Sequence, residues 1–275
     1  MSLSNSKFAP APPAAELSFR PFLSLLKKEI KRFLKVSIQT VLTPIVSSSL
    51  YLLIFGVSLG AFIKVAEGVT YLEFLIPGLV MMGCLNNAFQ NASSSVIVAK
   101  FAGDLEDLKV SPISYFQIIS AIALGGLFRG VLVGFITFLV GSLFTYFSIG
   151  HVLGVAHPLW LFYFLTVGGL AFSLLGLATA FWAKSFDHMS AVNSFILLPL
   201  IYLGGVFFSI HTLHPFWQSL ARLNPLLYFI NGVRHGLLGV SDVNPLVAAA
   251  IAFLTLCILY VIAFATLKRS SFVRW

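Results

Sequence analysis

The charged residues in the middle of this 275-residue chain gather in one short segment, 100–112, with long apolar runs on either side. Three carboxylates and two lysines alternate there with apolar residues, in the order Lys100, Phe101, Asp104, Leu105, Glu106, Asp107, Leu108 and Lys109. Leu105 and Leu108, three positions apart, fall on one face of a helix. Gly103 or Asp104 suits its first position and Pro112 its end. The pattern predicts a short amphipathic helix outside the membrane, whose chemistry is contact with another protein.

The other groups that could perform catalysis or bind a metal are isolated. His211 and His214 lie three residues apart, but no Cys, Asp or Glu within a few residues completes a metal site. Asp187 and His188 are adjacent, yet no nucleophile accompanies them. A phosphate-binding glycine loop followed by Lys-Ser/Thr does not occur in the sequence. We therefore predict no catalytic residue, no metal site and no cofactor in this chain.

The composition is that of a membrane protein. Hydrophobic residues make up 59% of the chain, charged residues 9%, and the mean hydropathy is +0.98. Soluble domains carry about a quarter charged residues. The net charge of +8 is distributed as membrane topology requires, which argues against nucleic-acid binding. The sequence predicts an all-α membrane protein surrounded by the lipid bilayer.

Two regions precede the first long apolar run. Residues 1–16 are rich in proline, alanine and serine, which indicates a flexible tail. Region 17–37 instead places apolar residues at helical spacing and lysines along another side, at Lys27, Lys31 and Lys35. This pattern predicts an amphipathic helix in the headgroup plane with its lysines facing anionic lipid. A core or coiled-coil helix is the alternative.

Region 38–275 is expected to form a six-span transmembrane domain. The predicted spans are 41–63, 74–99, 115–147, 159–183, 191–210 and 245–267. Thirteen Lys and Arg lie on the side of the two termini, which also holds segment 100–112 and Lys184. The opposite side holds three, which are Lys64, Arg222 and Arg234. Because positive charge collects on the cytoplasmic side, both termini are expected in the cytoplasm.

Polar side chains interrupt the second span. Asn87, Gln90, Asn91 and Ser94 follow the spacing i, i+3, i+4 and i+7, so they share one helix face. Such a row suits the lining of a path for an amphipathic substrate. The alternative is a set of hydrogen bonds that hold neighbouring helices together.

The third span combines a glycine face with a charge. Gly126, Gly130 and Gly134 recur at every fourth position, so another helix is expected to approach closely there. Arg129 lies beside that face, near the middle of the membrane, where an arginine usually faces protein or water. It is a candidate path residue, or else a structural arginine that binds backbone carbonyls.

The region after the fifth span is too apolar for an exposed loop and too interrupted for one span. Gly204 and Gly205 loosen the end of the span. Asn224 as N-cap and Pro225 at the first helical position predict two short helices within 214–239. We predict a re-entrant helical hairpin at the outer side, with Arg222 and Arg234 at its interface and a role as outer gate.

Taken together, three stretches make the chain similar to the permease subunit of type-2 ABC exporters over nearly its whole length. Segment 99–112 resembles the coupling helix of that family. The second stretch is 198–209, with Pro199, Gly204 and Gly205. The third, similar to the C-terminal signature of the family, carries Phe216, Trp217, Asn224, Pro225, Tyr228, Asn231, Gly232, Arg234 and Gly236. The resemblance is strongest to proteobacterial inner-membrane permeases of unassigned substrate.

The resemblance implies an assembly in the bacterial inner membrane. Two copies of this chain would bind two P-loop ATPase subunits, which hold ATP and Mg, and the path would run between the copies. Region 17–37 would be the connecting helix. The residues implied to contact the ATPase are Gly103, Asp104, Leu105, Glu106, Asp107, Leu108 and Pro112.

The sequence also leads to expectations about the substrate and about the energy source of transport. A lipid, a lipid-linked glycan or a hydrophobic drug suits the amphipathic path better than a small ion. The six predicted spans contain no Asp or Glu, the usual ion relays of secondary carriers. An ion-coupled carrier or channel and a non-transporting membrane scaffold are the alternatives.

Overall fold

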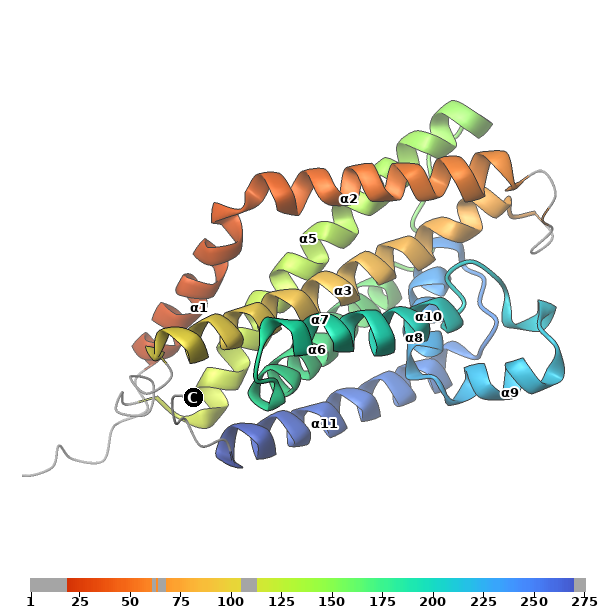
Figure 1. The fold of residues 1–275 in the computed structure, drawn as a ribbon. Coiled ribbons are helices and arrows are strands. Elements are labelled where there is room, and N and C mark those ends of the chain that lie inside the picture. The colour runs from red at the N-terminus through yellow and green to blue at the C-terminus, as the bar shows by residue number, and fades with distance from the viewer. Residues whose placement is uncertain (1–18, 61–62, 64–67, 105–112, 270–275) are drawn as a thin grey trace, which may run out of the picture.

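Within lipid a spanning segment must satisfy its own backbone hydrogen bonds, so long apolar runs form helices. The computed structural model describes residues 19–60, 63, 68–104 and 113–269. This part of the chain is a bundle of helices without a β-strand (Figure 1). The first described helix, α1 (Phe19–Lys35), meets α2 (Ser37–Tyr51) at a sharp bend, and α2 continues through a π-helical segment, Leu52–Ser58.

Six helices are long and apolar enough to cross a membrane, which confirms the predicted number. Besides the α2 span, Ser37–Ser58, they are α3 (Tyr71–Ala102), α5 (Tyr115–Ile149), α6 (Pro158–Trp182), the combined segment Phe186–Leu203 and α11 (Pro245–Arg269). Segment Phe186–Leu203 consists of α7 (Phe186–Val192), a π-helical turn (Asn193–Leu197) and α8 (Leu198–Leu203).

Two predicted spans, the first and the fifth, are wrong by several residues at both ends. The first span runs over 37–58 rather than 41–63, because the helix takes in the polar residues before Val41. The fifth span ends at Leu203 rather than at 210, because Gly205 adopts a positive φ of 83°. Such a φ suits glycine and stops a helix.

The glycine face of the third span is confirmed, and its partner is α3. A Cβ at Gly130 would lie 2.6 Å from the carbonyl oxygen of Cys84, and one at Gly134 would lie 3.3 Å from that of Val80. The corresponding distance from Gly126 to the oxygen of Ala88 is 2.9 Å. Each step of four residues along α5 therefore meets a step of four along α3. Only glycine lets the two backbones approach this closely.

The predicted break in the region after the fifth span is confirmed. Helix α9 (Pro215–Leu223) is followed directly by α10 (Pro225–Leu238). The Asn224 side chain accepts a hydrogen bond from the backbone N–H of Leu226, and Gly239 ends α10 with a φ of 75°. The Asn224 amide also donates to the Leu200 carbonyl at 2.6 Å, which fixes the start of α10 to α8.

The bundle has two distinct ends (Figure 1). Helix α1 and the last turn of α11, which carries Lys268 and Arg269, lie at one end, called the basic end below. Helix α9 lies at the opposite end. The tail 1–16 predicted from composition is outside the described residues.

Replacement of Gly130 by alanine tests the α3–α5 contact. We expect Gly130→Ala to lower the stability of the protein by about 1–3 kcal/mol, because the new methyl group must displace the Cys84 carbonyl. Gly154→Ala is the matched control, since a Cβ at that position meets nothing within 4 Å. Thermal unfolding of both variants in detergent measures the difference. Equal midpoints for Gly130→Ala and the wild type would contradict the close contact.

Candidate functional site

The charged segment predicted to contact a partner is described only at its beginning. Leu105, Glu106, Asp107, Leu108 and Pro112 lie outside the described residues. Gly103 ends α3 in the left-handed conformation, with a φ of 84°, and Asp104 follows it. The Asp104 carboxylate lies 3.3 Å from Lys28 Nζ on α1, and both groups are about half exposed. At this end of α3, the segment's first residues are thus linked to α1.

A second contact at the basic end involves Lys100. Its ammonium group donates hydrogen bonds to the carbonyl oxygens of Phe181, at 3.3 Å, and Ala183, at 2.8 Å. These carbonyls lie at the C-terminus of α6, where unpaired carbonyl groups favour a positive charge. The last turn of α3 and Asp104 directly after it therefore contact α6 and α1.

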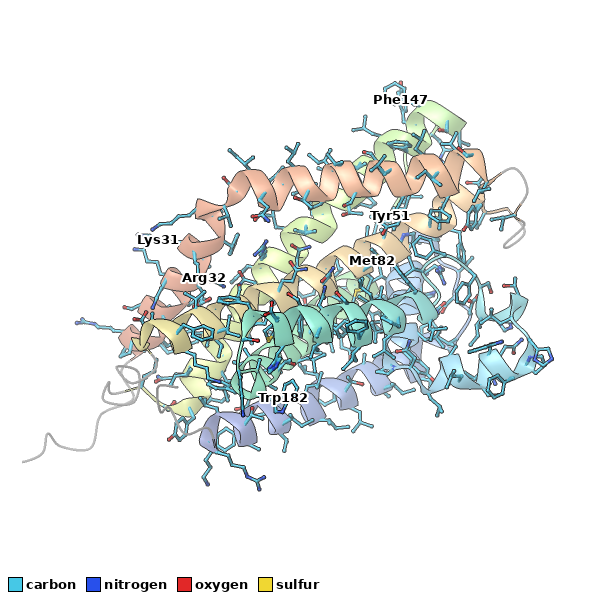
Figure 2. The ribbon with its side chains drawn as sticks, viewed as in Figure 1. Lys31, Arg32, Tyr51, Met82, Phe147 and Trp182 are labelled. Carbon is cyan, nitrogen blue, oxygen red and sulfur yellow. The ribbon has the colours of Figure 1, made fainter. Side chains whose placement is uncertain are left out.

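The polar residues of α3 have two different roles: some bind another helix, and others line a cavity. Asn91 is fully buried, and its side-chain and backbone oxygens accept hydrogen bonds from Arg32 Nη2 at 3.0 and 2.6 Å. Ser94 accepts from Arg32 Nη1 at 2.9 Å. Asn91 and Ser94 thus join α3 to α1, as the helix-joining interpretation expects. In Figure 2, Arg32 points into the bundle while Lys31 points away from it.

Arg32 is itself held by a buried acid that sequence reasoning overlooked. The Glu29 side chain, buried on α1, lies 3.2 Å from Arg32 and accepts a hydrogen bond of 2.6 Å from Ser95. Glu29 follows Leu25 by four positions and precedes Phe33 by four, and all three are buried on α1. An acid in line with the apolar face of an amphipathic helix was the signal for this contact.

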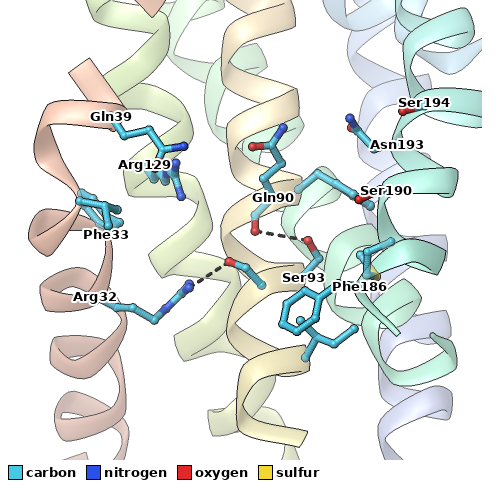
Figure 3. A pocket seen from close by; sticks show the side chains of 15 residues that line it. Arg32, Phe33, Gln39, Gln90, Ser93, Arg129, Phe186, Ser190, Asn193 and Ser194 are labelled. Carbon is cyan, nitrogen blue, oxygen red and sulfur yellow. Dashed lines mark hydrogen bonds between the residues drawn. The ribbon is translucent and has the colours of Figure 1, made fainter. Parts of the chain in front are cut away.

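Asn87 and Gln90, in contrast, line open space inside the bundle. A basic-end cavity of about 520 Å³ is bordered by α1, α3, α5 and α7, and Gln39, Gln90 and Arg129 line it (Figure 3). A second, central cavity of about 340 Å³ has the same three residues in its wall, together with Asn86 and Asn87. Because they share these three residues, the two cavities form one polar track.

Helix α2 supplies one wall of this track with a regular polar face. Gln39, Thr43, Ser47 and Tyr51 all line the central cavity and recur at every fourth position. On the other side the basic-end cavity is bordered by Ser190, Asn193 and Ser194 (Figure 3). The four-residue spacing in the first span was a usable sequence signal, and the sequence analysis missed it.

Arg129 is the one arginine in the track without a protein partner among the described residues. No hydrogen bond or ion pair reaches its guanidinium group from the described part of the chain, and its Nε is buried without an acceptor. Within the described residues, the structural alternative, an arginine bound to backbone carbonyls, therefore finds no carbonyl partner. The described walls of both cavities also contain no Asp or Glu.

Aromatic residues close the track at the end away from α1. The hydroxyl oxygens of Tyr51 and Tyr202 lie 3.5 Å apart, and both residues line the central cavity. Phe207 lies next to them, with ring centroids 5.7 Å from Tyr51 and 5.6 Å from Tyr202. The Tyr71 hydroxyl donates to the Phe207 carbonyl at 2.8 Å, which ties this cluster to the first turn of α3.

The side chain of Arg234, which was predicted at the outer interface, is fully buried within the protein. Its guanidinium group donates to the Gly205 carbonyl at 2.7 Å and to the Asn231 side chain at 3.1 Å, and covers the Phe74 ring at 3.8 Å. Burial lowers the pKa of Arg234 to about 10, while Asp242, 3.9 Å away, opposes the shift. The guanidinium therefore remains charged at neutral pH.

Asp242 extends this network to the turn between α8 and α9. Its carboxylate accepts hydrogen bonds from the Ser209 hydroxyl at 2.8 Å and from the Ile210 backbone N–H at 2.9 Å. The Asp242 backbone N–H donates to Asn231 at 3.0 Å. Of the five residues predicted as an outer gate, Gly205 and Arg234 therefore contact each other directly. Asn224 and Pro225 lie at the start of the same helix, α10, and Gly204 precedes Gly205.

The Glu29–Arg32 contact leads to a stability prediction. Glu29→Gln keeps the shape of the side chain but leaves Arg32 without its counter-charge, so we expect a loss of about 1–3 kcal/mol. The matched control is Lys31→Gln, which removes an exposed charge from the same helix. Thermal unfolding in detergent gives the readout. An unchanged midpoint for Glu29→Gln would show that this ion pair does not stabilise the α1–α3 contact.

Comparison with known proteins places this architecture in a family. The ABC-2 type transporter family matches residues 20–238. The inner membrane transport permease YadH of Escherichia coli (strain K12) is 37% identical over 253 residues, which cover 91% of this chain and 96% of YadH. Nodulation protein J of Rhizobium leguminosarum bv. viciae is 25% identical over 265 residues, 94% of this chain and 96% of that protein. With its six apolar helices, the chain is a multi-pass membrane permease that belongs to the ABC-2 type transporter family.

Proposed function

We propose that this chain is the transmembrane subunit of an ATP-driven exporter in the bacterial inner membrane. Membership of the ABC-2 family and the similarity to an inner membrane permease support a transporter subunit rather than an enzyme. ATP and Mg are then bound by a separate P-loop ATPase. In this proposal the basic end faces the cytoplasm, because the Lys and Arg residues collect there.

The observation that carries this proposal is the polar track inside a bundle of apolar helices. Amide and hydroxyl groups at Gln39, Asn87 and Gln90 line it beside Arg129. Uncompensated polar surface is costly in a membrane and usually marks a substrate pathway. An ion-coupled carrier would need a titratable acid in such a pathway, and the described walls of the track contain none.

A second copy of the chain is proposed to cover the open side of the track. The track lies between α2 and segment Phe186–Leu203, and both expose large apolar residues, among them Ile38, Leu42, Phe195 and Ile196. Polar groups cannot face acyl chains without cost, whereas a second copy would enclose the track and bury this apolar surface. The path would then run along the contact between the two copies.

Movement of the ATPase subunits is proposed to enter the membrane domain through segment 100–112. Asp104 contacts Lys28 on α1, and Lys100 holds the end of α6. Helix α1 in turn is fixed to α3 by Arg32. A displacement of the segment would therefore move α1, α3 and α6 together. Coupling of this kind requires that the ATPase contact differ between nucleotide states.

The outer gate is proposed to include two adjoining structures. One is the tyrosine pair with Phe207, which ends the track. The other is the network of Arg234, Asn231 and Asp242, which holds the Gly204–Gly205 turn against α10. Because the network is buried and hydrogen-bonded, the hairpin would move as one body, and opening would separate Tyr51 from Tyr202.

Purification from membranes through an N-terminal tag tests the proposed function. We expect a P-loop ATPase to copurify in equal amount and to hydrolyse ATP. The double variant Glu106→Ala/Leu108→Ala should lose the ATPase while still inserting in the membrane, because these residues carry the predicted contact face. The control Gln218→Ala/Leu223→Ala alters two residues of α9 at the opposite end and should retain it.

A chain that purifies alone, without ATPase activity, would contradict the proposal and favour the scaffold or the ion-coupled carrier. Transport by the chain alone would select the carrier. Loss of the ATPase in both double variants would show that the 100–112 segment is not a specific contact.

A further inference from the structure

Arg129 stands out among the charged residues inside the bundle. Arginine stays protonated in proteins, so its charge must be balanced by something. Arg32 has Glu29 at 3.2 Å, and Arg234 has Asp242 at 3.9 Å. All three have a buried Nε without an acceptor, but only Arg129 has neither an acid nor a carbonyl partner for the rest of its guanidinium group within the described part of the chain. Its guanidinium group instead faces the two cavities that it lines.

The surroundings of Arg129 specify the chemistry of that partner. The residue lies at the junction of the two cavities, since it lines both of them. Arg32 lines the basic-end cavity as well, and the described cavity walls contribute no acid. Side-chain amides and hydroxyls from three sides can donate further hydrogen bonds, as Figure 3 shows for Gln39, Gln90 and Asn193. A guanidinium group among such donors recognises phosphate or carboxylate.

The size of the track also limits the ligand. The basic-end cavity of about 520 Å³ can hold a headgroup with an attached sugar or a short linker, within the range of small-molecule pockets. Beside the track, α2 and the Phe186–Leu203 segment present exposed apolar side chains, among them Leu42, Val46 and Phe195. An apolar tail could follow these side chains while the polar head remains inside.

We propose that Arg129 binds the acidic headgroup of the substrate, so that the substrate class is an anionic amphiphile with a phosphate or carboxylate head. That this ligand is a transported substrate rests on the proposed function. Its binding to Arg129 requires only this chain. Gln39 and Gln90 position the headgroup by hydrogen bonds, and Arg129 supplies the charge. A cationic amphiphile would meet an uncompensated positive charge and be excluded.

Direct binding to the purified permease in nanodiscs of neutral phosphatidylcholine tests the proposal. The probe is dodecyl phosphate, and the comparison ligands are dodecyl maltoside, dodecyltrimethylammonium and inorganic phosphate. Binding is measured by native mass spectrometry and by the shift in thermal midpoint. We expect dodecyl phosphate to bind most tightly, the cation not to bind, and inorganic phosphate to bind weakly. Equal binding of dodecyl phosphate and dodecyl maltoside would overturn the proposal.

Variants then assign the binding to Arg129. Arg129→Gln should weaken dodecyl phosphate binding by about tenfold or more, because a charge-assisted hydrogen bond is lost. Arg129→Lys should retain part of the affinity. Arg222→Gln, which removes an exposed arginine of α9, is the matched control and should bind as the wild type does. Binding by Arg129→Gln at wild-type affinity would overturn the proposal.

A variant that keeps Arg129 shows whether weaker binding comes from the altered site or from a folding defect. Gln90→Glu places a carboxylate in the same cavities, so it should also weaken dodecyl phosphate binding, while Gln218→Glu on α9 should not. Full binding by Gln90→Glu would count against the site. Binding of inorganic phosphate as tight as that of dodecyl phosphate would assign the site to a free anion and overturn the amphiphile.

The two proposals fail separately. If an ATPase copurifies but dodecyl phosphate does not bind, the exporter stands and the anionic substrate falls. If dodecyl phosphate binds at Arg129 but no ATPase copurifies, the site stands without the exporter.

Discussion

A charge enclosed by apolar helices needs a partner, and this constraint organises the bundle. Arg32 meets Glu29, Asn91 and Ser94, which fixes α1 to α3. Arg234 meets Asp242 and the Gly205 carbonyl, which fixes α10 to the turn after α8. These two arginines are structural because their partners are in the chain. Arg129, with no partner in the described residues, is different in kind.

The position of the unpartnered arginine follows from the packing of α5. Glycines on one face of α5 contact the backbone of α3, and Arg129, the residue before Gly130 in sequence, lies beside that face. The close backbone contact sets how α5 is rotated, and it places the Arg129 side chain in the space between α1, α2 and α3. Helix packing in the membrane and the chemistry of the track are therefore consequences of the same small residues.

Sequence patterns predicted the features that depend on local chemistry. The six spans, the close helix contact of the glycine face, and the break at Asn224 and Pro225 were predicted because spacing and capping act within a few residues, whereas the partner helix, α3, was not. The division of the α3 polar face between Asn91, which binds Arg32, and Gln90, which lines the track, was not predicted. It depends on where α1 packs, a contact some 60 residues distant in sequence.

The burial of Glu29 and of Arg234 was missed for the same reason. Ser95 binds Glu29 and Gly205 binds Arg234, and both partners lie on segments that meet these residues only in the folded chain. The polar face of α2, with Gln39, Thr43 and Ser47 at every fourth position, was in contrast visible in sequence and was overlooked. Hydroxyl residues in an apolar span are common, and only their common direction indicates a path.

The most direct test of the central claim, a track that opens alternately to the two sides of the membrane, is cysteine accessibility. The variant carries Gln39→Cys together with Cys257→Ser, which removes an exposed cysteine. It is reconstituted in membranes with the ATPase and labelled with a membrane-impermeant maleimide. We expect labelling from the basic end without nucleotide and from the opposite side when ATP and vanadate trap the ATPase. Labelling from the same side in both states would contradict it.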